Sequence, residues 1–144
     1  MQKINLGIVV CSNRDWVTPF ASSLLGMVLH LREQPLADEQ MVMMKLKNQC
    51  SLLPDAFETA FEECLRDKAT HVLLLADDMI FPRDVAHRLF AHGKRCVAIN
   101  MRLKRIQSED FASIDMEGNS LTSVGKTGLE EVTSMSPAIM LLDA

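Results

Sequence analysis

The stretch of sequence that decides the fold is HVLLLADDMIFP, residues 71–82. Its apolar run from His71 to Leu75 is too short for a helix and contains no helix breaker, which predicts a buried strand. Two acids follow at once, and Pro82 suits the first turn of a new helix. We therefore expect Asp77 and Asp78 at the carboxyl end of a core parallel strand, the edge where open α/β sheets bind ligands.

The two acids have two interpretations. Carboxylates at a strand end can hold a hard cation through oxygen, and the cation can in turn hold phosphates. Alternatively, Asp77 and Asp78 cap the helix that follows, because acids are favoured at helix N-termini. The acids alone leave both interpretations open.

Outward from this stretch, apolar runs alternate with helical stripes. Strands are predicted near 4–10, 40–46, 71–76 and 96–100, mostly parallel, and helices over 16–32, 54–66 and 83–92. Gly118 and Asn119 lie between two alternating runs and predict a hairpin within 111–124, and 131–142 is expected to hold a final strand or pair of strands. The predicted fold is a three-layer α/β/α sandwich forming a single domain over residues 1–144.

Polar side chains follow the first predicted strand. Ser12 and Asn13 can hydrogen-bond a base or a ribose, and Arg14 can meet a phosphate or stack on a base. The alternative is an ordinary strand-to-helix turn. Because parallel strands end at the same edge of a sheet, we expect these three residues to lie within one pocket of Asp78.

Other charged and polar residues have less specific interpretations. Asn100, Arg102 and Lys104 leave the fourth predicted strand and can contact a diphosphate or an anionic acceptor, or form a solvated basic loop. We expect Lys45, Lys47 and Asn48, near the end of the second strand, to be solvated; the alternative is that they line the edge that would meet a nucleotide. A solvated face is likewise expected for the acids of the second helix region: Glu58, Glu62, Glu63 and Asp67.

The amino-acid composition limits the classes of partner that we expect the chain to bind. The formal net charge of −4 gives no electrostatic case for DNA or RNA as the main partner. Tyrosine is absent and there is a single tryptophan, so an aromatic platform for single-stranded nucleic acid is not expected. With 48% apolar residues, the 144-residue chain can fill a sizeable core.

The cysteines and the apolar runs bear on location. Cys11, Cys50, Cys64 and Cys96 are widely spaced and form no CxxC pair, so neither a zinc site nor a redox motif is suggested. Free buried thiols fit a reducing, cytoplasmic location. The N-terminal residues include Lys3 but no long apolar region, so no signal peptide is expected. No apolar run reaches the roughly 18 residues of a membrane span, so none is expected.

A family resemblance enters at the acidic stretch. Residues 73–82 resemble the "apolar strand, Asp-x-Asp, apolar, Phe-Pro" stretch of GT-A glycosyltransferases, and most closely that of the short glycosyltransferase-like proteins common in phages and prophages. The similarity extends over 4–14, 69–71, 85–105 and 132–143. The chain departs from the family pattern in three places: Ala76, where the family usually has its first Asp; Phe57-Glu58, in place of a common Arg-Asn pair; and Ser136-Pro137-Ala138, in place of a glycine-rich piece.

The resemblance implies a nucleotide-diphosphate sugar as donor and Mn²⁺ or Mg²⁺ as cofactor, with transfer of the sugar to an unknown acceptor. It makes Asp78 the direct metal ligand, with Asp77 assisting through metal, water or ribose. Ser12, Asn13 and Arg14 would form the nucleotide side. The family's acceptor-side half usually follows the final strand; we expect it to be missing here, so no catalytic base is identified.

Two alternatives stand beside the enzyme. In the first, the chain is a binding or assembly module that kept the nucleotide half of the fold and lost turnover. In the second, it is a fragment of a longer enzyme. An exposed apolar edge near Met140 to Leu142 would then favour self-association into a homo-oligomer.

Overall fold

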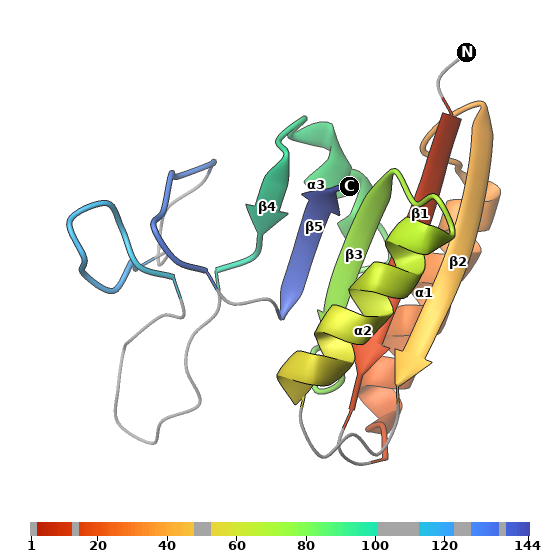
Figure 1. The fold of residues 1–144 in the computed structure, drawn as a ribbon, viewed down its shortest axis with the longest axis horizontal. Coiled ribbons are helices and arrows are strands. Elements are labelled where there is room, and N and C mark those ends of the chain that lie inside the picture. Colours follow the sequence, from red (N-terminus) through yellow and green to blue (C-terminus); the bar gives the residue numbers. More distant parts are fainter. Residues whose placement is uncertain (1–2, 13–14, 48–52, 101–112, 123–127, 136–137) are drawn as a thin grey trace.

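The computed structural model describes residues 3–12, 15–47, 53–100, 113–122, 128–135 and 138–144 as a mixed α/β domain (Figure 1). Strands and helices alternate along the chain, as the apolar pattern predicts. The elements are β1 (Lys3–Cys11), α1 (Thr18–Glu33), β2 (Glu39–Lys47), α2 (Leu53–Arg66), β3 (His71–Ala76), α3 (Val85–Ala91), β4 (Cys96–Ala98) and β5 (Ile139–Asp143).

The strands form one sheet in the order β2-β1-β3-β5-β4. β1 pairs in parallel with both β2 and β3. β5 lies between β3 and β4 and runs antiparallel to both, so β4 has the same direction as β3. Four of the five strands thus run in one direction, as predicted, but two of the four strand pairings are antiparallel, so the sheet is mixed.

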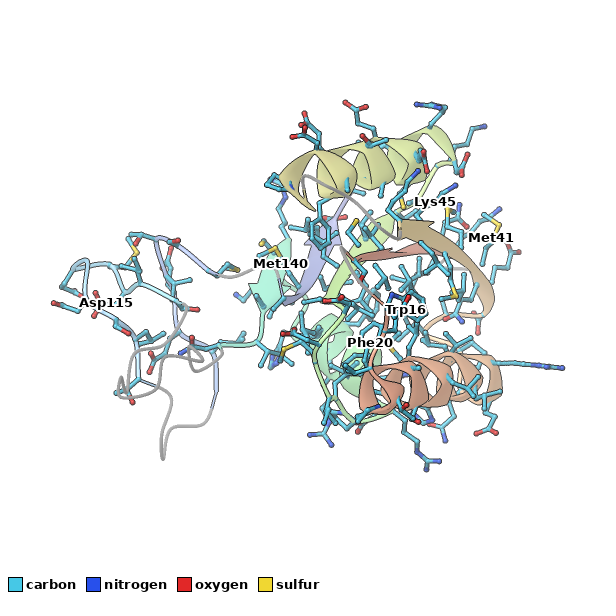
Figure 2. All side chains as sticks on the ribbon, turned by 90° about the horizontal axis from the view of Figure 1, so that it is seen from below. Trp16, Phe20, Met41, Lys45, Asp115 and Met140 are labelled. Carbon is cyan, nitrogen blue, oxygen red and sulfur yellow. The ribbon has the colours of Figure 1, made fainter. Side chains whose placement is uncertain are left out.

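Helices cover both faces of the sheet, which gives three layers (Figures 1 and 2). Alternate residues of β1 point to opposite faces, as in any strand. Ile8 and its even-numbered neighbours pack with α1 and α3, whereas Val9 packs with Ala60 and Cys64 of α2. Because both faces of the central strands are buried, their sequences read as continuous apolar runs.

α1 forms because its apolar residues recur at helical spacing. Phe20, Leu24, Met27 and Leu31 make one buried stripe against the sheet. Burial of each such side chain is worth roughly 1.5–3 kcal/mol. The helix begins two residues later than predicted, because Val17 has an extended backbone (φ −74°, ψ 141°) and serves as the N-cap residue.

α2 approaches β1 closely at Gly7. A Cβ atom built on Gly7 would lie 2.6 Å from Sγ of Cys64, a separation that packed atoms do not adopt. Cys64 is itself fully buried, and burial raises the pKa of its thiol. Here the absence of a side chain allows the helix to approach the strand.

The burial of the cysteines follows the prediction in part. Cys11 and Cys64 are buried, Cys50 lies outside the described residues, and Cys96 is exposed. The expectation of burial is wrong for Cys96 because β4 is an edge strand of the sheet. Among the described residues, no helix is both long enough and apolar enough to cross a membrane.

The predicted apolar edge near Met140 to Leu142 is wrong. These residues belong to β5, which is hydrogen-bonded on both sides, and Met140 and Leu141 are only 8% and 3% exposed. Within the described part of the chain, β2 and β4 are the edge strands. The local pattern showed an apolar strand but not which neighbours it would pair with.

Residues 113–122 and 128–135 lie beyond β4, apart from the three layers (Figure 1); we call them the outlying segment. Of the predicted hairpin, the described residues show an antiparallel bridge between Ile114 and Ser120, on either side of Gly118 and Asn119; residues 111–112 and 123–124 lie outside the described part of the chain. The carboxylate of Asp115 accepts the backbone N–H groups of Glu117 (3.0 Å) and Asn119 (2.8 Å), which turns the chain instead of extending it. The final strand starts at Ile139, later than predicted.

Candidate functional site at the carboxyl edge of the sheet

The first and third strands bring two predicted site residues together. β1 and β3 are parallel with Cys11 opposite Ala76, so the residues that follow leave the sheet at the same edge. The buried hydroxyl of Ser12 donates a hydrogen bond to Oδ2 of the half-buried Asp77. Ser12 and Asp77 thus leave the sheet at the same edge, as predicted. The pocket that Ser12, Asn13 and Arg14 were expected to share with Asp78 stays a prediction, and Asn13 and Arg14 lie outside the described residues.

The acidic pair does not cap the next helix. α3 begins only at Val85, and its N-cap residue is Asp84, which makes no side-chain capping bond. Asp84 instead accepts a hydrogen bond from Nε of Arg88 (2.9 Å), which holds the pKa of that carboxyl below its ordinary value. The capping alternative is therefore wrong, as is the placement of Pro82 in the first turn of a helix.

The chain after the acids turns back on itself and is anchored on α1. Met79 N–H lies 3.4 Å from the carbonyl oxygen of Ala76, and Phe81 is buried. The Phe81 N–H donates to Oγ of Ser23 (3.3 Å), and its ring packs edge-on against Phe20 at 6.1 Å between centroids. This anchoring fixes one end of the loop that begins with the acids.

Trp16 extends the same aromatic row and was not predicted as a site residue. Its ring packs edge-on against Phe20, 5.4 Å between centroids (Figure 2). Its Nε1 is buried and has no acceptor among the described residues. A buried donor without a partner costs about 1–3 kcal/mol, so it is suited to an oxygen of a ligand. The only signal in the sequence was its position four residues after Ser12.

A third segment reaches the same edge. Because β5 runs antiparallel, it starts where β3 ends, and the carbonyl of Ala138 accepts the N–H of Ala76 at 2.7 Å. Ala138 belongs to the piece that replaces the glycine-rich motif of the resembled family. The edge is thus bounded by the ends of β1 and β3 and by the start of β5.

The lysines of β2 are not simply solvated. Nζ of Lys47 donates to Oε1 of Glu63 at 2.7 Å, and Lys45 pairs with Asp67. The hydrogen bond from Lys47 lowers the pKa of Glu63, and the hydrogen bond to Asp67 raises the pKa of Lys45. The expected solvated face is confirmed for Glu58, Glu62 and Asp67, which are exposed. Lys45, Lys47 and Glu63 are instead partly buried, because β2 and α2 pack side by side with opposite charges.

Asn100 has a structural role at the end of β4. Its Nδ2 donates to the carbonyl of Leu121 (2.7 Å), and its Oδ1 accepts the N–H of Ser113 (3.2 Å). These bonds tie the outlying segment to the sheet. Arg102 and Lys104 lie outside the described residues, so the predicted diphosphate or acceptor contacts of this loop stay a prediction.

The donor atoms at the edge suit a hard cation. The described residues contain no group of three or more His, Cys, Asp and Glu side chains that could hold a metal by themselves. Mg²⁺, however, is typically held by one or two carboxylates together with substrate phosphates. Asp77 and Asp78, adjacent and half-buried at a strand end, fit that second mode.

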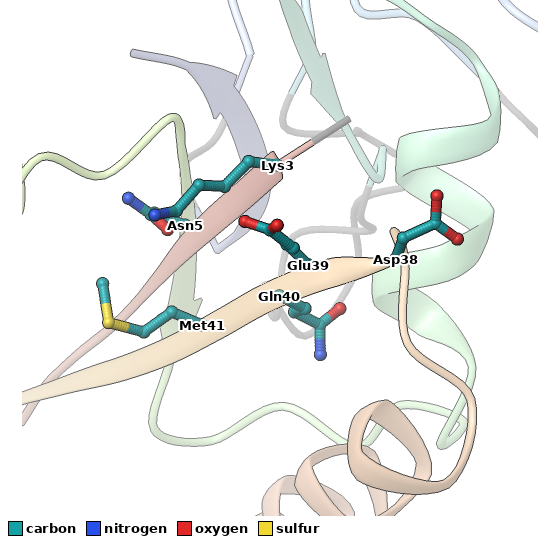
Figure 3. A pocket seen from close by; sticks show the side chains of 6 residues that line it. All are labelled: Lys3, Asn5, Asp38, Glu39, Gln40 and Met41. Atoms are coloured by element: carbon teal, nitrogen blue, oxygen red, sulfur yellow. The ribbon is translucent and has the colours of Figure 1, made fainter. Parts of the chain in front are cut away.

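Two hollows of the surface lie away from the acids. One, of about 390 Å³, lies at the amino ends of β1 and β2, with Lys3, Glu39 and Met41 among its lining residues (Figure 3). The other, of about 940 Å³, lies between α3, β4 and the outlying segment; Asn100 and the basic side chains of Arg88 and Arg95 contribute to its wall. Neither wall includes Ser12 or the acidic pair.

Comparison with models of known protein families finds no match, and a search of curated proteins finds no significant relative.

Proposed function

We propose that the edge formed by Ser12, Asp77 and Asp78 binds a nucleotide-diphosphate sugar together with Mn²⁺ or Mg²⁺, and that the chain is a GT-A-like glycosyltransferase domain. The observation that carries the proposal is the hydrogen bond from Ser12 to Asp77, which joins segments 65 residues apart at the carboxyl edge of parallel strands. Ligand sites of open α/β sheets lie at this edge.

The geometry suggests different roles for the two acids. Because Oδ2 of Asp77 accepts the hydroxyl of Ser12, this carboxylate is held in one orientation and is suited to positioning water, ribose or metal. Asp78 is the proposed direct ligand, following the family resemblance. The cation, when bound, neutralises charge that develops on the leaving diphosphate. The buried Nε1 of Trp16 is a further donor for a ligand oxygen.

Failure of the capping interpretation supports this assignment. Acids that begin a helix are explained by the helix dipole alone. Here the helix starts at Val85, seven residues after Asp78, so the dipole does not explain the acids. Two adjacent half-buried carboxylates at a strand end are suited to holding a cation together with substrate phosphates.

One observation favours a second candidate, a module that binds the donor without turning it over. Ala76 stands where the resembled family usually has its first Asp, and its backbone N–H is already bonded to Ala138. Its methyl group offers no ligand to a metal. A site with two carboxylates would hold the donor through the cation more weakly than one with three.

Calorimetric titration of UDP-, GDP- and ADP-sugars, with and without Mn²⁺, tests the proposal. We expect metal-dependent binding of at least one donor to the wild-type chain. Asp78→Asn should weaken it by at least roughly tenfold, since even the loss of a residue that only supports a metal ligand costs 10–100-fold. Asp38→Asn, at the opposite edge before β2, is the matched control and should bind like wild type.

The outcomes separate the candidates. Metal-dependent binding followed by release of free nucleoside diphosphate indicates an enzyme, and binding without release indicates a module. Absence of binding for every donor, or equal binding by wild type and Asp78→Asn, contradicts the assignment of the site. Thermal melts of each variant establish that the chain is folded.

A further inference from the structure

β2 has an unpaired side. It lies at the end of the sheet, and within the described ranges no strand pairs with its outer edge. The carbonyl of Lys47 accepts the N–H of Ser12 at 2.8 Å. The backbone N–H and C=O groups of Lys47 therefore point inward, toward β1. Backbone groups alternate in direction along a strand, so the N–H and C=O groups that point outward are those of Gln40, Val42, Met44 and Leu46.

The same strand exposes apolar side chains. Met41, Met44 and Leu46 are 46%, 38% and 44% exposed, and the nine residues of β2 include no proline. Met44 and Leu46 lie on the face that carries α1, the face where Val42 packs against the core. A long apolar edge strand with open hydrogen-bonding groups is a template for pairing with another strand.

We propose that β2 pairs with β2 of a second copy of this chain, antiparallel about a twofold axis at Met43, to form one continuous sheet across two copies. This register sets Val42 opposite Met44 and Gln40 opposite Leu46, so all the outward backbone groups find partners. On the face of α1, the exposed side chain of Met44 packs against Val42 of the partner copy, and that of Leu46 packs against Gln40, so both lose contact with water.

The charges of β2 are complementary in this register. Glu39, near one end of the strand, comes opposite Lys47 of the partner copy at the other end, twice in each dimer. Both residues are odd-numbered and therefore lie on the same face of the sheet, the face of α2. Lys47 already pairs with Glu63 on that face, and its ammonium has three donors to share between two carboxylates.

Neighbouring registers are less favourable. An axis at Val42 leaves Leu46 and Lys47 without opposite residues in β2, and an axis at Met44 leaves Glu39 and Gln40 without them. The register centred on Met43 alone uses all nine residues of the strand. Opposite charges directly across a pair of strands stabilise it, whereas like charges destabilise it.

Pairing of β2 with β2 of a second copy is also more favourable than pairing of β2 with β4, the other edge strand, of a second copy. β4 has only three residues, so pairing of β2 with β4 of another copy would leave most of β2 open. That contact would also be head-to-tail and would generate open chains. The twofold β2 contact is self-complementary and closes after two copies.

Sedimentation velocity on the full chain tests the pairing. From roughly 1 to roughly 300 µM, a range that suits a small interface, wild type should shift from monomer to dimer. Met44→Pro removes an outward N–H without touching the ladder to β1, and should weaken the dimer at least about tenfold. Met44→Ala keeps that N–H and is the matched control, with a smaller effect.

Charge exchange gives the sharper experiment. Glu39→Lys and Lys47→Glu each place like charges at both ends of the strand pair, so each variant alone should be monomeric. Mixed together, they restore opposite charges at both ends and should form the heterodimer. Thermal melts check that each monomer is folded.

Three results would overturn the proposal. They are a wild type that stays monomeric over the whole range, a dimer that Met44→Pro does not weaken, and a mixture of the charge variants that does not associate. In the first case any partner of the β2 edge must be another molecule. In the second, the dimer uses another surface.

Discussion

The five-stranded sheet and the outlying segment are held in place by different interactions. In the sheet, apolar side chains such as Leu73 and Ile8 are completely removed from water between helices. In the outlying segment, side chains such as Leu129 and Met116 are about half exposed, and hydrogen bonds to the carboxylate of Asp115 shape the chain. Apolar burial is cooperative and global, whereas these polar contacts order only a few residues.

The two regions also differ in how their polar side chains are held. In the sheet, the polar pair of Ser12 and Asp77 lies at the end of two rigid strands, an arrangement that holds side chains in fixed positions. In the outlying segment, the carboxylate of Asp115 accepts the backbone N–H groups of Glu117 and Asn119, and the carbonyl of Leu121 accepts Nδ2 of Asn100. We therefore place the proposed donor site on the sheet.

The largest expected difference between the regions comes from one matched pair of leucines. Leu73→Ala, in β3, should lower the free energy of unfolding by about 2–5 kcal/mol, because it leaves a cavity at a fully buried position. Leu129→Ala, in the outlying segment at 48% exposure, should change it by less than about 0.5 kcal/mol. Urea unfolding of both variants measures the two values. Equal losses would mean that the outlying segment shares the core's cooperativity.

An intermediate effect is expected at the contact of α2 with β1. Gly7→Ala places a methyl group against Sγ of Cys64 and should cost about 1–3 kcal/mol by overpacking. In a Cys64→Ala background the same change should cost much less, because the sulfur is gone. A double-mutant cycle by urea unfolding measures the coupling. Strictly additive losses would show that the contact is not the cause.

The smallest effect on global stability is expected at Asp115. Asp115→Ala should leave the unfolding transition nearly unchanged while the amides of Asn119 and Glu117 exchange faster with solvent, because both lose their acceptor. Hydrogen exchange by NMR measures this. Asp38→Ala is the control for loss of an exposed carboxylate. Unchanged exchange at Asn119 would rule out the carboxylate as what orders the turn.

The same loop should respond to acid. The hydrogen bond from Asn119, followed by those from its neighbours, lowers the pKa of Asp115. A carboxyl with a depressed pKa stabilises the folded form above its unfolded pKa, about 3.9 for Asp, and loses this contribution as the pH falls through the lower folded value. An NMR titration should therefore show the turn intact at pH 5 and opening as the pH falls below about 4.

The sequence by itself determined the order of the elements and the edge that carries the acids. The run from His71 to Leu75 is too short for a helix, and its burial on both faces requires a central strand. Parallel pairing with the first strand then puts Ser12 and Asp77 at one edge. These features follow from local periodicity and strand direction, which a single sequence contains.

Only the tertiary structure decided which elements became neighbours. β5 lies between β3 and β4, so Met140, which was expected at an exposed edge, is in the interior of the sheet. β2 is left as an edge strand. Lys47 forms an ion pair with Glu63, and the indole N–H of Trp16 is buried without an acceptor among the described residues. Strand pairing and side-chain partnership depend on contacts between residues far apart in the chain, which local pattern and propensity do not specify.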